Sequence, residues 1–342
     1  MFHFVFLTYF SLLTSFISLF PKELDNKTYE ISGLAQGTTY SIKYIYVNAV
    51  VNKNAIDSIF DLMDYNFSLY KTFSLINSFN KVPQSIQLTD HFSTLIRNAN
   101  FVSAATAGAF DITTLPLSIL WGKFNSGTIL APDNFQIQTA LAYSGYQNIY
   151  IKGDSLFKKQ SLLKLDADGI AQGYTVDIIS AYLCSLGIKD FLVEVGGEIR
   201  TNGINSSKQP WVVGFIGASD YNSDGATSSR LALSGMSVST SGRLSKFSNT
   251  NIGKKSHIID PRTGKTVENN IVSVTVLSPK CVLTDAFDNG MMVLGLDSAF
   301  KLCSNFTDMG LHIVYTSDSG DIRDSANAFF KKHILKPETG SF

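Results

Sequence analysis

The chain has 342 residues with no net charge, and 44% of its residues are hydrophobic while only 16% are charged. This length fits one large domain or two ordinary ones. The charged share is below the roughly 25% usual for soluble domains, so uncharged polar residues must cover much of the surface. The neutral balance and the lack of a basic run argue against a nucleic-acid partner. The three cysteines, Cys184, Cys281 and Cys303, have no metal or redox spacing and are expected to be buried thiols.

Residues 1–20 contain no Asp, Glu, Lys or Arg. Their length and polarity match a secretory signal or a single membrane anchor, although a charged n-region and an A-x-A cleavage site are missing. We expect export to the extracytoplasmic (periplasmic) side and association with the inner membrane through this segment. The alternative is a cytosolic chain with a misassigned start, and the sequence leaves open whether the segment is cleaved or retained. Residues 21–30 are expected to form a polar linker, and residues 31–342 a single domain.

After residue 30, predicted strands and helices alternate without an internal repeat. Alternating apolar residues predict strands, and apolar residues at helical spacing predict helices. The predicted strands cover residues 41–51, 148–151, 161–165, 211–216, 231–238, 272–277 and 311–315. The predicted helices cover residues 55–65, 88–107, 131–144 and 284–294. This mixture predicts a single α+β (mixed α/β) domain built as two lobes.

The stretch from Leu165 to Gly197 combines structural and chemical signals. It predicts a turn at Asp168-Gly169, a helix that stops at Gly187, and a buried strand closed by a Gly-Gly turn. A loop that opens a helix gathers backbone N–H groups and suits a phosphate. Asp166 and Asp168 flank the turn, and a phosphate site with two acids usually needs a bridging cation. The plain alternative is an ordinary strand–helix–strand unit.

A second acidic cluster begins at Thr284, a candidate helix N-cap. At about 100° per residue, Asp285, Asp288 and Asn289 fall on one face of the predicted helix, at its N-terminal end. Acidic side chains in a first turn also interact favourably with the helix dipole. The alternative to a metal or ligand role is therefore simple capping of the helix. Oxygen ligands without cysteine indicate a hard cation, and Mg²⁺ bridging a diphosphate fits better than an all-protein calcium site.

His257 lies in a dense run of functional residue types that ends in Asp260, Pro261 and Gly264. A lone histidine is often structural. This one is near Ser239-Thr-Ser-Gly242 in the sequence, so a general base is an equal alternative.

Eight motifs, in order along the chain, resemble those of the FAD:protein FMN transferases, the ApbE-like flavin transferases. They are G-x-x-x-GTTY (33–40), S-x-Y…S-x-x-N (68–77), AFD-x-T-x-x-PL (109–117), LD-x-x-GIA-x-GY-x-VD (165–177), V-x-x-GG-x-I (193–199), S-x-STSG (237–242), HIIDPRTG (257–264) and TDA-x-x-x-G (284–290). The resemblance implies a tunnelling-fold-like architecture with FAD between the two lobes. It also implies cleavage of FAD and transfer of FMN to a Ser or Thr hydroxyl of a partner protein, with release of AMP.

The resemblance assigns roles to individual residues. Asp285, Asn289 and the backbone carbonyl of Gly169 are the implied Mg²⁺ ligands, which makes Asp285 catalytic, and His257 is the implied base for the acceptor hydroxyl. The implied FAD contacts are Gln36, Tyr70, Ala109, Phe110, Asp111, Asp166, Gln172, Asp288 and a backbone group near Ile258. Tyr70 and Phe110 offer planar surface to a ring system. The acceptor is expected to be a flavoprotein subunit of a membrane or extracytoplasmic electron-transfer complex.

Four positions depart from the usual family residues. The family often has Met at the place of Gln36, Gly at Asp168, Lys or Glu at Gln172, and Thr at Asn289. An Asn oxygen is still a workable ligand for a hard cation. Two alternatives stay open at this level: an FAD diphosphatase, in which water replaces the acceptor hydroxyl, and a non-catalytic flavin-binding protein.

Overall fold

An eight-stranded antiparallel sheet is the frame of the computed structural model, which describes residues 26–124, 131–222, 229–242 and 258–335. The strand order is β1-β2-β6-β7-β10-β11-β12-β13. The strands are β1 (Lys27–Ala35), β2 (Thr38–Tyr46), β6 (Asp190–Val195), β7 (Glu198–Asn202), β10 (Ser237–Gly242), β11 (Ile271–Ser278), β12 (Gly310–Thr316) and β13 (Ile322–Ala326). The predicted linker is too long by four residues, because Lys27 to Glu30 already pair with Tyr46 to Lys43 of β2.

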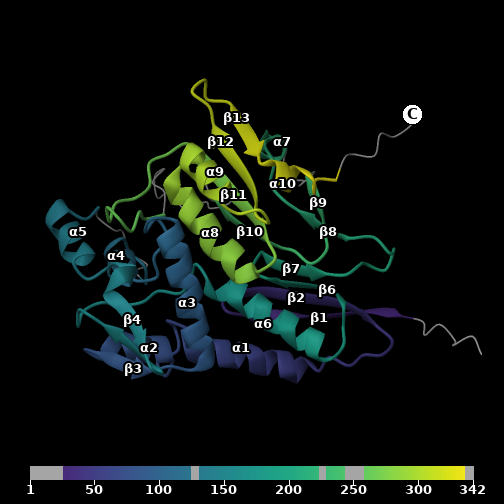
Figure 1. The fold of residues 1–342 in the computed structure, drawn as a ribbon, viewed down its shortest axis with the longest axis horizontal. Helices are drawn as coiled ribbons and strands as arrows, with labels where there is room; N and C mark the ends of the chain where they lie inside the picture. Colours follow the sequence, from purple (N-terminus) through teal and green to yellow (C-terminus); the bar gives the residue numbers. More distant parts are fainter. Residues whose placement is uncertain (1–25, 125–130, 223–228, 243–257, 336–342) are drawn as a thin grey trace, which may run out of the picture.

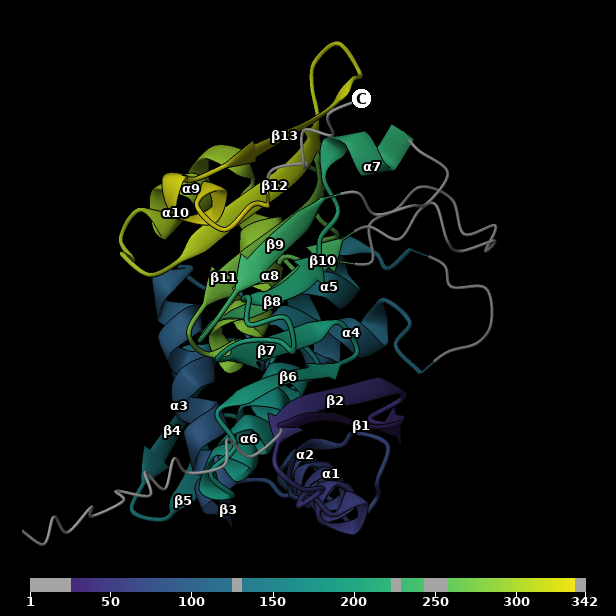
Figure 2. The same ribbon diagram turned by 90° about the vertical axis from the view of Figure 1, so that its right-hand side faces the viewer.

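One face of the sheet is covered by helices, and the other by a hairpin. The covering helices are α1 (Lys53–Phe67), α3 (Asp90–Ala105), α6 (Ala171–Ser185), α8 (Cys281–Leu294) and α9 (Leu296–Cys303). In Figure 2, α3, α6 and α8 lie behind the strands, and the β8 (Trp211–Gly214) and β9 (Arg230–Leu233) hairpin lies in front. Apolar clusters fill both interfaces, so the sheet is buried on both sides over much of its area.

A smaller lobe stands beside this body, at the left of Figure 1. It contains a three-stranded antiparallel sheet, β3 (Ser85–Gln87), β5 (Ser155–Lys158) and β4 (Ile149–Lys152). Short helices complete the described elements: α2 (Leu75–Lys81), α4 (Leu115–Leu120), α5 (Asn134–Leu141), η1 (Tyr146–Asn148), α7 (Ala218–Asn222) and α10 (Ala328–Lys331). The predicted α+β class is confirmed, whereas the predicted strand at 161–165 is wrong, because these residues form a turn and irregular chain.

The central stretch folds largely as predicted. Helix α6 begins at Ala171, directly after the Asp168-Gly169 turn, and ends before Gly187, which has a positive φ of 78°. This left-handed conformation is the usual helix stop, and glycine adopts it without steric cost. The chain then enters β6, which pairs with β2 at the centre of the buried layer. The loop before α6 is therefore held between fixed elements.

Helix α8 starts one turn earlier than predicted. It begins at Cys281, so Thr284 is not its N-cap but an internal residue whose hydroxyl donates to the carbonyl of Cys281 at 2.9 Å. The cap comes from α6: the Asp177 carboxylate accepts the backbone N–H groups of Cys281 at 3.1 Å and Val282 at 3.0 Å. Asp285 and its neighbours consequently lie in the second and third turns, inside the packed interface between the two helices.

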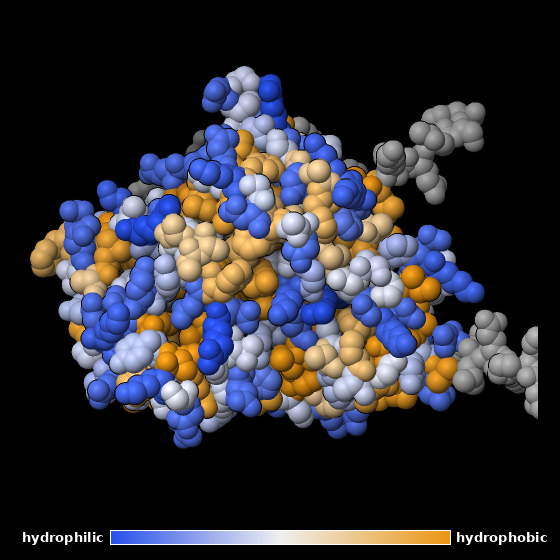
Figure 3. Space-filling model, in the orientation of Figure 1, coloured by the Kyte–Doolittle hydropathy of each residue, from blue (hydrophilic) through white to orange (hydrophobic). Residues whose placement is uncertain are grey.

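The surface in Figure 3 mixes hydrophilic and hydrophobic residues over the whole visible face. Within the part of the chain that the structure describes, no helix combines the length and the hydrophobicity needed to cross a bilayer. The predicted signal or anchor at residues 1–20 lies outside the described residues. Two thiols, Cys281 and Cys303, are buried as expected, but the expectation for Cys184 is wrong, because it lies on the exposed side of α6.

Candidate functional site

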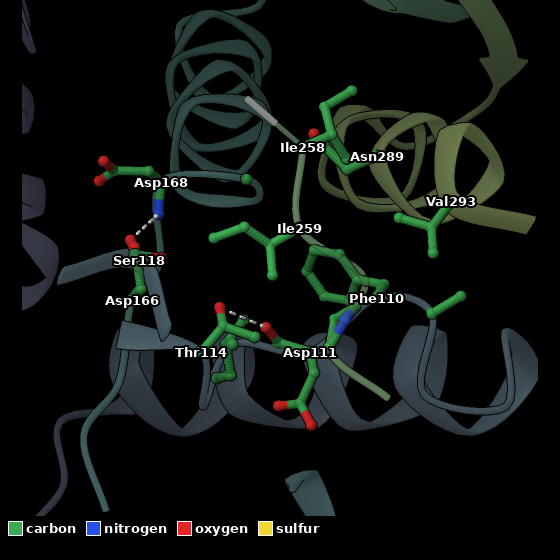
Figure 4. A pocket seen from close by; sticks show the side chains of 14 residues that line it. Phe110, Asp111, Thr114, Ser118, Asp166, Asp168, Ile258, Ile259, Asn289 and Val293 are labelled. Carbon is green, nitrogen blue, oxygen red and sulfur yellow. Dashed lines mark hydrogen bonds between the residues drawn. The ribbon is translucent and has the colours of Figure 1, made fainter. Parts of the chain in front are cut away.

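A cavity of about 290 Å³ opens between the smaller lobe and the entrances of α6 and α8. Its lining combines carboxylates with apolar side chains (Figure 4). The lining residues are Ala109, Phe110, Asp111, Ile112, Thr114, Ser118, Asp166, Asp168, Gly169, Ile258, Ile259, Pro261, Asn289 and Val293. Seven of the predicted site residues are among them, although they come from four separate segments of the sequence. A volume near the lower end of the roughly 300–1,000 Å³ usual for ligand pockets means that a dinucleotide would extend beyond it.

The two acidic segments meet at Gly169. A Cβ atom placed on Gly169 would lie 3.3 Å from Nδ2 of Asn289 and 3.5 Å from the ring of Phe110. Any larger residue would therefore fill the space between the loop and α8. The Asn289 side chain is held there by donating to the carbonyl of Asp285 at 2.8 Å, and its Oδ1 accepts from the Ser241 hydroxyl at 3.4 Å.

Asp285 faces the first turn of α6 from inside the helix–helix interface. Its Oδ2 accepts the backbone N–H of Gly173 at 2.8 Å, and the residue is 3% exposed. Burial raises the pKa of this carboxyl to about 7; the Gly173 hydrogen bond opposes the shift and the charge of Asp168 adds to it. Burying a charged carboxylate that has only one hydrogen bond costs free energy. A bound cation would offset that cost.

Asp288 and Glu198 form a second, deeper acidic pair that touches the same helix. Asp288 is 1% exposed, and its Oδ1 has no hydrogen-bond partner; Oε2 of Glu198 is likewise buried without one. Burial and the neighbouring carboxylates raise the pKa of both groups well above the usual range. Asp288 thus points into the body of the protein and not into the described cavity. Glu198 was missed at the sequence level, although it directly follows the Gly196-Gly197 turn of a recognised motif.

The Asp111 carboxylate organises the loop that carries Ala109 and Phe110. It accepts the N–H and the hydroxyl of Thr113 and the N–H of Tyr146, all at 2.7 Å. In Figure 4 this carboxylate points away from Phe110 and Ile259. Burial raises its pKa while the three donors lower it. Its side chain therefore holds the loop in place, while its backbone faces the cavity with Phe110.

Asp166 and Asp168 both form an ion pair with Lys123, a residue that the sequence did not point to. Nζ of Lys123 lies 2.5 Å from Oδ2 of Asp166 and 2.6 Å from Oδ2 of Asp168. Asp166 also accepts the N–H of Asp168 at 3.1 Å, which closes the turn in front of Gly169. Burial, and then the charge of Asp168, raise the pKa of Asp166, while Lys123 opposes the shift. The turn is thus held by a three-residue charge cluster.

Three further predicted FAD contacts, besides Asp288, lie outside the described cavity. Gln36, at the β1–β2 turn with a φ of 51°, donates to the hydroxyl of Thr175 on α6 at 3.0 Å, and its Oε1 is buried without a partner. Gln172 on α6 packs against Gly196, at 3.0 Å from where a Cβ would stand. Tyr70 is 71% exposed and meets Phe124 edge to face, with 5.6 Å between ring centroids. His257 lies outside the described residues, so its role stays a prediction; its neighbour Ile258 lines the cavity.

The predicted metal-ligand atoms of Gly169, Asp285 and Asn289 are all oxygens, which are the ligands that a hard cation prefers. Among the described residues no group of three or more His, Cys, Asp or Glu side chains is arranged to hold a metal ion. The predicted set contains a single carboxylate, an amide and a backbone carbonyl, so it does not depend on such a group. The absence of a side chain at Gly169 lets the turn approach Asn289 closely, and an ion held by these residues would take its further ligands from substrate or water.

Comparison with known proteins identifies the family. The ApbE family profile matches residues 36–313. A FAD:protein FMN transferase of Vibrio cholerae serotype O1 is 30% identical over 332 residues, covering 95% of this chain and 98% of its own, and one of Haemophilus influenzae is 28% identical, covering 92% and 94%. The solved flavin transferase ApbE from Vibrio cholerae superposes with a TM-score of 0.81 at 28% identity, covering 90% of this chain and 100% of that chain. The apo Pseudomonas stutzeri flavinyl transferase ApbE gives 0.80 at 29%, covering 90% and 97%. The chain belongs to the ApbE family and has its fold.

Proposed function

We propose that this protein is a Mg²⁺-dependent FAD:protein FMN transferase. It would move FMN from FAD to a Ser or Thr hydroxyl of an acceptor protein and release AMP. The observation that carries the proposal is that Gly169 and Asn289, which are distant in sequence, meet at one cavity. Asp285 lies one helical turn before Asn289, whose side chain donates to the Asp285 carbonyl. The relatives that bear this name match nearly the whole chain, which supports the same reaction.

The oxygens of Asp285, Asn289 and Gly169 would hold the Mg²⁺ ion. When bound, that ion neutralises negative charge on the phosphate oxygens of the leaving AMP. The N–H of Gly173 helps to keep the Asp285 carboxylate ionised and oriented. Asp111 fixes the loop that presents Phe110, and Phe110 with Ile259 provides an apolar wall that limits the access of water.

In the transfer itself, the acceptor oxygen forms a bond to the phosphorus of the FMN half. The bond from that phosphorus to the bridging oxygen of the diphosphate breaks, and AMP leaves with this oxygen. His257 would take the proton from the acceptor hydroxyl, which makes a weak alcohol nucleophilic. The acceptor would be a flavoprotein subunit of a membrane or extracytoplasmic electron-transfer complex. Residues 1–20 would bring the enzyme to that side of the membrane.

The test is mass spectrometry of a candidate Thr-containing acceptor incubated with the protein, FAD and Mg²⁺. An FMN-sized mass gain on the acceptor, matched by AMP, supports transfer. AMP and free FMN without acceptor labelling indicate the diphosphatase. Bound FAD without AMP indicates a non-catalytic flavin-binding protein and contradicts the proposal.

A further inference from the structure

Lys123 is held at the cavity by the turn that ends α4. Its backbone N–H donates to the carbonyl of Ser118 at 2.8 Å, and Gly122 before it adopts a positive φ of 102°. The indole N–H of Trp121 donates to the carbonyl of Gly264 at 2.8 Å and fixes the turn to the loop on the other side of the cavity. The side chain of Lys123 is 19% exposed, so its ammonium is a placed charge and not a freely moving surface group.

The charge of this ammonium matters because its surroundings are acidic. The carboxylates of Asp166 and Asp168 line the cavity, and Asp285 lies one helical turn before the lining residue Asn289, whereas no Lys or Arg is among the described lining residues. A diphosphate brings two further negative charges. Without a nearby cation, the lining would repel an anionic dinucleotide and attract free divalent cations. Lys123 offsets one of the two carboxylates that it contacts.

We propose that Lys123 is a specificity residue that sets the charge of this cavity. Its ammonium keeps Asp166 and Asp168 from holding a divalent cation of their own, and it lets the anionic dinucleotide approach the loop before α6. This inference rests on the proposed function for the identity of the substrate. Its electrostatic part concerns only the residues named here.

A second observation links this cluster to the predicted metal ligands. Asp168 directly precedes Gly169, which lies against the side chain of Asn289. Lys123 lies 2.6 Å from the Asp168 carboxylate, so its charge is next to the predicted ligands. Removing the ammonium would therefore change ion binding at the predicted metal ligands as well as at the turn.

The experiment compares Lys123→Met, Lys123→Arg and a control, Lys53→Met, which removes a surface lysine paired with Asp57. Mg²⁺ alone is titrated by calorimetry, and FAD is titrated separately by fluorescence in Mg²⁺ buffer. In Lys123→Met we expect Mg²⁺ to bind more tightly and FAD more weakly, each by on the order of tenfold. Lys123→Arg and Lys53→Met should stay within about twofold of the parent.

Opposite shifts separate this proposal from a structural role. Loss of packing would weaken both ligands together, whereas loss of a charge moves a cation and an anion in opposite directions. The double variant Lys123→Met/Asp168→Asn should return both affinities toward the parent values, because it restores the charge balance. Unchanged affinities in Lys123→Met, weakening of both ligands, or no recovery in the double variant would each overturn the inference.

Failure of the proposed function would look different. The parent protein would then bind no FAD or release no AMP, and the substrate part of the inference would fall with it. The titration of Mg²⁺ alone still decides the electrostatic part, since it uses no flavin.

Discussion

The backbone N–H of Gly173 donates a 2.8 Å hydrogen bond to Oδ2 of Asp285, and this contact joins the first turn of α6 to the second turn of α8. The two helices approach each other closely here. A Cβ atom on Gly173 would stand 2.4 Å from the carbonyl of Cys281 and 2.7 Å from Cβ of Asp285. The predicted metal ligand is therefore positioned by a contact that only glycine permits.

Gly173→Ala is expected to destabilise the fold by about 1–3 kcal/mol, because the added methyl group must push the two helices apart. The free energy of unfolding can be measured by urea denaturation followed by circular dichroism. Cys184→Ala on the exposed side of the same helix is the control and should stay within about 0.5 kcal/mol of the parent. Equal stability of Gly173→Ala and the parent would contradict the packing described here.

Asp177 is expected to matter through α8 and not through its own helix. Asp177→Ala removes the acceptor for two backbone N–H groups at the start of α8 and leaves Arg200 without its ion-pair partner. We expect a loss of about 1–3 kcal/mol in the free energy of unfolding. Lys53→Ala, which removes an exposed i,i+4 pair, should cost no more than about 0.5 kcal/mol. If the two variants lose equal stability, the Asp177 cap does not contribute more to the free energy of unfolding than an exposed ion pair.

Mg²⁺ affinity should depend on pH through Asp285. Its pKa is raised to about 7, so below that pH a proton competes with the ion, and affinity should fall about tenfold per pH unit. Calorimetric titrations between pH 5.5 and 8.5 would measure this slope. In Asp285→Asn the slope should disappear together with most of the affinity. A slope that persists in Asp285→Asn would assign the proton to another group.

The raised pKa of Asp285 also makes the stability of the metal-free protein depend on pH. A carboxyl whose pKa is raised from 3.8 to about 7 on folding binds its proton more tightly in the folded state. Its contribution is therefore complete below about pH 4 and is lost as pH rises to about 7. In the presence of chelator, Asp285→Asn should gain stability relative to the parent as pH rises through this range. A difference between the two proteins that does not change with pH would contradict the raised pKa.

His257→Ala should abolish transfer to the acceptor and leave FAD binding intact, since the imidazole is proposed to take a proton and not to hold the dinucleotide. Acceptor labelling and FAD fluorescence titrations measure the two properties separately. His333→Ala, at the C-terminal side of α10, is the matched control and should keep both. Loss of FAD binding in His257→Ala would show that this histidine has a structural role.

Local sequence signals predicted the parts of the site that depend on near neighbours. The turn at Asp168-Gly169, the helix after it and its stop at Gly187 follow from backbone preferences within a short window. The ordered motifs also predicted that the segment around Gly169 meets the one around Asn289. These features need no knowledge of how distant side chains pair.

The features that were missed depend on long-range pairing. The start of α8 was misplaced because its cap, Asp177, precedes Cys281 by 104 residues. Lys123 was overlooked because its partners, Asp166 and Asp168, follow it by 43 and 45 residues. Helical periodicity placed Asp288 beside Asp285, but it could not show that Asp288 faces the interior. Polar residues on a helix have the same spacing whether their side chains face a ligand or a buried acid.

The most direct test of the central claim is a crystal structure of the protein with FAD and Mn²⁺, in which the anomalous signal locates the ion. We expect one peak within roughly 2.5 Å of oxygens from Asp285, Asn289 and the carbonyl of Gly169, with the diphosphate of FAD in contact with it. Bound FAD with the ion at a place that these three residues do not reach would contradict the account.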